Sequence, residues 1–288
     1  LMTMKKGSSH FNDADIDKLL ESYNKYKPEL FLPIDFPPLI NMSIAQKIDR
    51  WKMTIDSLQV TLKRMDDSNL SRKNLVPVIH GFSEKSLRKV LYDDEVGIFG
   101  LTDWDKIALG AQKQLLQKMT FVPTFGKIFC NTVAKLREFV GDERWLHILA
   151  AGGEKSLPLI YYLGANSADS NSWYIAAIHG RVTIPVSGAH KLLVPRKKQL
   201  LQEMKLSLCD RKYLENCTCE ICKTLDSGSQ IKMLNDDLYL RLQHNLFVNI
   251  THSKLLSQLE KKELGVWIRN TQRSSSLWPV YQYALEHF

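Results

Sequence analysis

Between residues 217 and 222 the chain reads CTCEIC, a C-x-C-x-x-C motif. Thiolates this close repel one another unless they are protonated, oxidised or bound to a cation. Zn²⁺ binds four ligands tetrahedrally, and three thiolates with one imidazole make a closed site that leaves no position for catalysis. His244, 22 positions after Cys222, is the predicted fourth ligand. The sequence predicts one structural zinc per chain, bound by Cys217, Cys219, Cys222 and His244.

The remaining cysteines, Cys130 and Cys209, stand apart from this trio, which makes five in all. An odd, clustered set argues against a secreted disulfide framework and favours a metal site in a reducing compartment. We therefore expect a cytoplasmic protein. The alternative interpretation is that the trio is merely buried and that His244 lies on the surface without a ligand role.

The composition is that of a globular protein, with 288 residues, 44% hydrophobic and 24% charged. There is no uninterrupted apolar run of about 18 residues and no secretory leader, so no membrane association is expected. The net charge is +8, and residues 181–212 hold eight Lys or Arg against two acids. This stretch is either a solvated basic face or a phosphate-binding surface. The candidate nucleic-acid-binding residues are Arg181, Arg196, Lys197 and Lys198.

Short β-prone runs alternate with amphipathic runs along the chain. Strands are predicted at 31–35, 75–79, 96–101, 145–150 and 165–173, and helices at 14–26, 43–65, 83–92, 104–143 with a break at Pro123, and 155–163. Such alternation is typical of parallel βαβ units in an α/β fold. Polar or glycine residues recur where the strands end, which is the rim that carries the active site in a (β/α)8 TIM barrel. An open doubly wound sheet would show a similar alternation.

The domain prediction follows from these patterns. We expect residues 1–200 to form a partial (β/α)8 barrel carrying the active site, with its N-terminal strands upstream of Leu1. Residues 201–250 are predicted to form an inserted zinc-binding subdomain, and 251–288 a helical segment that packs on the barrel.

The cysteine motif followed by His244-Asn245-Leu246 resembles the zinc site of the tRNA-guanine transglycosylases. Other segments are similar to that family in the same order along roughly residues 10 to 270. They are the strand before a proline turn at 32–38, the strand at 76–81, the glycine-containing strand at 97–101, the strand at 146–152 and the Ala-Asp-Ser segment at 168–173. Their collinear order is more specific than any one of them except the zinc motif.

The resemblance implies Asp169 as the catalytic nucleophile. It implies a substrate-binding role for Asp35, His80, Gly81, Gly100, Leu101 and Gly152. His80 stands where the family usually has glutamine, which changes the hydrogen bonds offered to the base. The family's second catalytic Asp lies in an Asp-Ser-Gly segment that would precede Leu1.

The activity implied is that of a pentosyltransferase, which replaces guanine in a nucleic acid by a 7-deazaguanine through a covalent Asp–sugar intermediate. The implied partners are tRNA or DNA and the free base. Histidine in place of glutamine at position 80 resembles the members of the family that modify DNA. A homodimer or heterodimer is left open. Two alternatives remain: a non-catalytic transglycosylase-like subunit that binds nucleic acid, and a purely structural zinc protein with a basic binding stretch.

Overall fold

The computed structural model describes residues 13–66, 70–94, 97–185, 188–190, 193–195, 201–203, 208–225 and 229–288. The chain divides into two compact units, Leu1–Leu149 and Ala150–Phe288, and each is described by itself. The predicted domain boundaries at 200 and 250 both fall inside the second unit. Among the described residues, no helix has the length and apolarity needed to cross a bilayer.

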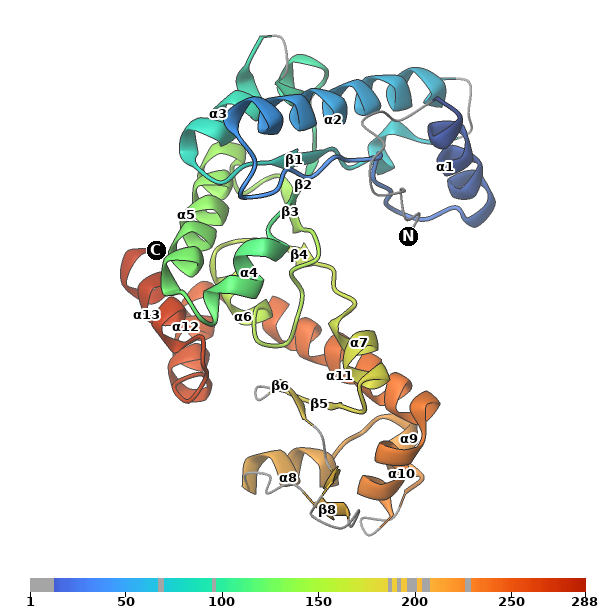
Figure 1. Cartoon of the computed structure of the whole chain (residues 1–288), viewed down its shortest axis with the longest axis vertical. Helices are drawn as coiled ribbons and strands as arrows, with labels where there is room; N and C mark the ends of the chain where they lie inside the picture. Colours follow the sequence, from blue (N-terminus) through green and yellow to red (C-terminus); the bar gives the residue numbers. More distant parts are fainter. Residues whose placement is uncertain are drawn as a thin grey trace. The chain divides into compact units, whose positions relative to one another are not determined.

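A parallel sheet lies at the centre of the first unit (Figure 1). Strands β1 (Val78–His80), β2 (Lys106–Gly110) and β3 (Trp145–Ile148) pair in that order, all parallel. His80 is opposite Gly110 in the register, so the strand ends lie level with each other. The predicted strand at 31–35 is reduced to a parallel bridge between Phe31 and Leu75. The α/β class with parallel strands is confirmed, whereas an eight-stranded barrel is not confirmed by the strands described.

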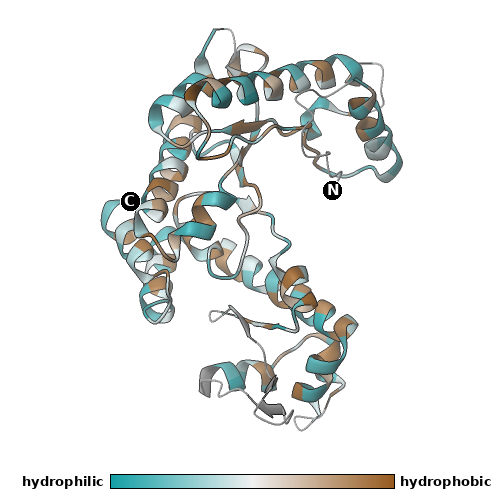
Figure 2. Ribbon diagram, in the orientation of Figure 1, coloured by the Kyte–Doolittle hydropathy of each residue, from teal (hydrophilic) through white to brown (hydrophobic). Residues whose placement is uncertain are grey.

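Helices accompany this sheet in the first unit, and capping residues explain where two of them begin. The first unit contains α1 (Asp13–Tyr26), α2 (Ile44–Met65), α3 (Glu84–Tyr92), α4 (Lys113–Met119) and α5 (Pro123–Val140). Ser43 caps α2 in a capping box with Gln46, and a proline opens α5. Helix α2 carries hydrophobic and hydrophilic residues, as expected of a helix with one buried face (Figure 2). Its buried face includes Trp51, Ile55 and Leu58.

Between residues 96 and 143 the strand predicted at 96–101 was wrong, and the helical stretch predicted from 104 begins later than expected, with α4. Residues Ile98–Gly100 form a short 3₁₀ helix, η2, and not a strand. The strand is β2, which begins at Lys106, within the range predicted to be helical. The rest of that range is mostly helical as predicted, and α5 begins at Pro123, the predicted break. The indole N–H of Trp104 donates to the carbonyl of Ile98 at 3.0 Å and holds this turn. The apolar run of β2 is buried between its two neighbours, which is why it lacks the alternation of a half-exposed strand.

The second unit is mainly helical. Its helices are α6 (Leu157–Tyr162), α7 (Ser172–Ile178), α8 (Leu208–Glu215), α9 (Glu220–Lys223), α10 (Gln230–Asp236), α11 (Leu238–Ser257), α12 (Lys261–Thr271) and α13 (Trp278–His287). Its strands are β4 (Ser167–Ala168), β5 (Val182–Ile184), β6 (Gly188–His190), β7 (Leu193–Pro195) and β8 (Leu201–Glu203). β5 pairs with β6 and β7 with β8, both antiparallel. The strand predicted at 165–173 is only two residues long, and α7 follows it.

Candidate metal centre and strand-end residues

The three clustered cysteines are positioned by one short turn and its helix. Cys217 follows α8, Cys219 is the N-cap of α9, and Cys222 lies within α9. The backbone N–H of Cys222 donates to the Cys219 sulfur at 3.2 Å, so this sulfur also caps the helix. The spacing of the motif therefore turns all three sulfurs toward one point.

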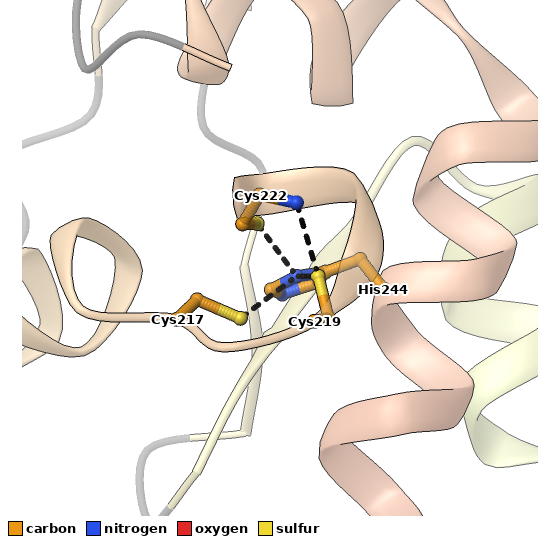
Figure 3. Close-up of side chains that lie close together, drawn as sticks. All are labelled: Cys217, Cys219, Cys222 and His244. Carbon is orange, nitrogen blue, oxygen red and sulfur yellow. Dashed lines mark hydrogen bonds between the residues drawn. The ribbon is translucent and has the colours of Figure 1, made fainter. Parts of the chain in front are cut away.

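His244, in α11, completes the group. Its Nδ1 lies 3.7 Å from the sulfur of Cys217, 3.6 Å from that of Cys219 and 3.3 Å from that of Cys222. Figure 3 shows the three sulfurs directed at the imidazole. Tetrahedral zinc with bonds of about 2.3 Å to sulfur and about 2.0 Å to nitrogen separates S and N by about 3.5 Å. The four side chains thus fit a Cys₃His metal site, and all four ligand atoms lie within 4.8 Å of one another.

The orientation of His244 is fixed from its far side. Its Nε2 lies 3.0 Å from the carbonyl oxygen of Thr183 in β5 and donates to it, which leaves Nδ1 as the ligand atom. The next residue, Asn245, accepts the N–H of the same Thr183 at 2.7 Å. Its amide group donates to the carbonyls of Trp173 and Arg181. Two adjacent residues of α11 therefore hold both backbone groups of one strand residue.

The contacts among these four side chains shift their pKa values. Contacts with Cys217 and Cys222 lower the pKa of the Cys219 thiol well below its ordinary value. Contacts with Cys217 and Cys219 raise the pKa of the Cys222 thiol well above its ordinary value. Burial lowers the pKa of His244, but the contacts with Cys217 and Cys219 outweigh it and raise the pKa to about 9. A divalent cation lets all three thiols ionise together, so the group could hold a metal ion.

Apolar side chains enclose the centre. Val182 and Ile184 of β5, with Leu214 and Leu234, form one buried cluster together with Cys219 and Cys222. Two of the candidate metal-binding residues are thus part of the small hydrophobic core of this region. A metal there would join α9, α11 and β5, as expected of a structural site.

Asp35 and His80 lie together in the first unit. Nε2 of His80 is 3.2 Å from Oδ2 of Asp35, close enough for an ion pair when the imidazole is protonated but without an aligned hydrogen bond. The Asp35 side chain is 30% exposed, whereas that of His80 is 1% exposed. The ring meets the edge of Trp51 and lies against Gly110. Asp35 is therefore available to a ligand, and His80 is covered behind it.

Gly110 and Gln112 also contribute to this strand end, and the sequence did not predict a role for either. A Cβ at Gly110 would lie 2.5 Å from Cε1 of His80, so only glycine leaves room for the buried ring. The amide of the buried Gln112 donates to the carbonyls of Gly81 and Gly110 and ties the ends of β1 and β2 together. Their signal was the Gly-Ala step after the apolar run of β2. Gly100 and Leu101 were predicted to lie at a strand end in the substrate site. Gly100 is instead the last residue of η2 and Leu101 is its C-cap, so neither ends a strand.

Asp169 directly follows β4 and is exposed. Its Oδ1 accepts the N–H of Ala150 at 2.6 Å, and its carbonyl accepts the N–H of Gly152 at 2.8 Å. Ala150 has a φ of 55°, a left-handed conformation that alanine rarely adopts, so the carboxylate stabilises a strained turn. A Cβ at Gly152 would lie 3.1 Å from the carbonyl oxygens of Ala168 and Asp169, which explains the glycine.

Little of the basic stretch can be placed. Arg181 is exposed. Arg196, Lys197 and Lys198 lie outside the described residues. The prediction of phosphate contacts remains a prediction.

Compared with protein-family models and with the curated proteins, the chain matches none.

Proposed function

We propose that this protein replaces a guanine base in a nucleic acid by a 7-deazaguanine, and that its Cys₃His group holds one structural zinc. The observation that carries the proposal is that Cys217, Cys219, Cys222 and His244 lie together in a group that could hold one metal ion. This is the ligand set that the resemblance to tRNA-guanine transglycosylases implies. The proposal includes a (β/α)8 barrel, to which the parallel strands β1, β2 and β3 would contribute.

Base exchange at one sugar carbon with retained configuration requires two displacements through a covalent sugar–enzyme intermediate. Asp169 is the proposed nucleophile. Its exposure and the N–H of Ala150 that holds one carboxylate oxygen support this role, because a nucleophile must be both reachable and oriented. The target nucleotide must first leave its stack, which costs about a few kcal/mol.

Asp35 is proposed to recognise the edge of the base by accepting from its N–H groups. Asp35 is partly exposed and His80 beside it is buried, which supports a direct contact of the base with Asp35 and not with His80. His80 would then act on the base only through Asp35, whose carboxylate lies 3.2 Å from its ring. Gly110 and Gln112 would keep the strand ends in place. This revises the expectation that His80 itself contacts the base.

Zinc would supply no chemistry to the exchange, because three thiolates and one imidazole complete its coordination. The side chains around it keep α9, α11 and β5 together. The thiolate ligands need a reducing compartment, so the proposal places the protein in the cytoplasm. The acceptor is either DNA or tRNA, and the histidine in place of glutamine favours DNA.

The test is exchange of radiolabelled guanine into tRNA and into duplex DNA, with the complete gene product and matched nucleic-acid concentrations. Incorporation into one acceptor that is chased out by a 7-deazaguanine supports the proposal and identifies the acceptor. Binding of nucleic acid with no incorporation into either would favour a non-catalytic binding subunit.

A further inference from the structure

A cavity of about 180 Å³ lies in the second unit beside the metal centre. Its floor is one stripe of α11, since His244, Phe247, Val248, Thr251, His252 and Leu255 recur every three or four residues. Its walls come from the end of β5, from the segment around Tyr213 and from Trp267 of α12. Most of this lining is apolar. The volume is below that of a typical drug-sized pocket and suits one small ring system.

His252 distinguishes this cavity from a mere packing gap. Its side chain is buried, and neither ring nitrogen has a hydrogen-bond partner within the part of the chain that the structure describes. Buried polar nitrogens are normally paired, so two unpaired ones in one ring need an explanation. Burial lowers the pKa of His252 to about 4, so the ring is neutral near pH 7 and offers one donor and one acceptor.

Aromatic side chains stand around the same space. The ring centroids of His252 and Trp267 are 5.6 Å apart with a tilt of 44°, and Phe247 and Tyr213 also line the cavity. Aromatic walls favour planar ligands, and a neutral imidazole with apolar neighbours disfavours charged ones.

We propose that this cavity is a binding site for an uncharged heteroaromatic ring that carries both a hydrogen-bond donor and an acceptor. The ring packs against Trp267 and Phe247, and its polar edge pairs with the imidazole of His252. The site is separate from the base exchange proposed above, and neither depends on the other.

The probe is benzimidazole, which is neutral at pH 7.5 and has one N–H donor and one ring-nitrogen acceptor. Indene has the same shape without either group, and benzoate is an anionic control. Binding is followed through the ¹⁵N signals of the histidine side chains and by calorimetry, with the zinc-loaded protein. We expect saturable shifts of the His252 signals with benzimidazole, at least fivefold weaker binding of indene and no binding of benzoate.

Variants separate the two halves of the site. Trp267→Ala should weaken benzimidazole at least tenfold, whereas Val266→Ala, its exposed neighbour in α12, should not. His252→Phe keeps a ring in place and should bind benzimidazole no better than indene. Zinc content and melting temperature identify variants that fail to fold. The proposal is overturned if benzimidazole leaves the His252 signals of the wild type unchanged up to its solubility limit, or if well-folded Trp267→Ala binds it as tightly as the wild type.

Discussion

The Nε2 atom of His244 lies 3.0 Å from the carbonyl oxygen of Thr183, and this contact decides which nitrogen faces the three cysteine sulfurs. Because Nε2–H donates to the carbonyl, Nδ1 is the nitrogen that remains to bind a metal. The centre therefore depends on β5 as well as on its four ligands.

The first prediction concerns the metal. The purified protein should contain one zinc per chain, and Cys219→Ser should lose it and unfold the region around α9, because Cys219 is a proposed ligand and also the cap of that helix. Metal analysis and circular dichroism measure this. Cys130→Ala is the matched control, since this buried cysteine lies in the first unit. Retention of zinc by the Cys219→Ser protein would contradict the proposed zinc site.

The second prediction concerns Asn245, which is fully buried and makes three hydrogen bonds to backbone groups. Asn245→Ala leaves those groups unpaired and should cost about 3 kcal/mol or more of unfolding free energy. Zinc should also dissociate faster into a chelator, because β5 no longer holds Thr183 against His244. Asn249→Ala, one turn later in α11, is the control, with its two longer contacts at 3.5 and 3.3 Å. Equal effects of the two changes would argue against the clamp.

The third prediction is a pH dependence caused by His252. Its pKa falls from about 6.5 to about 4 on folding, because burial opposes its charged form. Between these values the unfolded chain binds more protons than the folded one, so stability falls as the pH is lowered from 6.5 to 4. The loss is at most about 3 kcal/mol. Hydrogen exchange of α11 amides should show a shallower pH profile in His252→Phe than in the wild type.

The control for this profile is His179→Phe, which changes an exposed histidine of the same unit. It should leave the slope as in the wild type. Acid also releases zinc, but equally in all three proteins, so only the difference between profiles reports His252. Identical profiles in His252→Phe and the wild type would show that this imidazole does not oppose protonation.

The fourth prediction separates Asp35 from His80. Asp35→Asn replaces an acceptor by a donor and should weaken binding of the free base by about 1–3 kcal/mol. His80→Phe should weaken it less, because the His80 ring is covered and a phenyl ring can still pack beside Trp51. Calorimetry with guanine measures both, and Asp142→Asn is an exposed control. A larger loss from His80→Phe than from Asp35→Asn would mean that the histidine contacts the base directly.

Local patterns predicted much of this molecule. The helices at 14–26, 43–65 and 83–92 are confirmed within a residue or so, because amphipathic periodicity marks all three and a serine caps each of the last two. The four metal-site residues come together as predicted, because ligand chemistry limits which side chains can share such a space. The helix periodicity and the spacing of the metal-site cysteines can both be recognised within a short stretch of sequence.

Other features depend on packing that no short stretch reveals. The apolar run near Ile98 has the composition of a strand, but the hydrogen bond from Trp104 holds it as a 3₁₀ turn. A short apolar run cannot be assigned to strand or helix by periodicity alone. The burial of His80 depends on Trp51 and on the missing side chain of Gly110, which are distant in sequence.

Trapping of the covalent intermediate tests the proposed function most directly. The complete gene product is incubated with its nucleic-acid acceptor, denatured and examined for a protein–nucleic acid adduct. Asp169→Asn keeps an oxygen that can accept from the N–H of Ala150 but removes the nucleophile, so the turn should persist. We predict an adduct with the wild type and with the exposed control Glu215→Gln, and none with Asp169→Asn at unchanged nucleic-acid affinity. An adduct with Asp169→Asn, or none with the wild type under conditions that support exchange, would contradict the assignment of Asp169 as nucleophile.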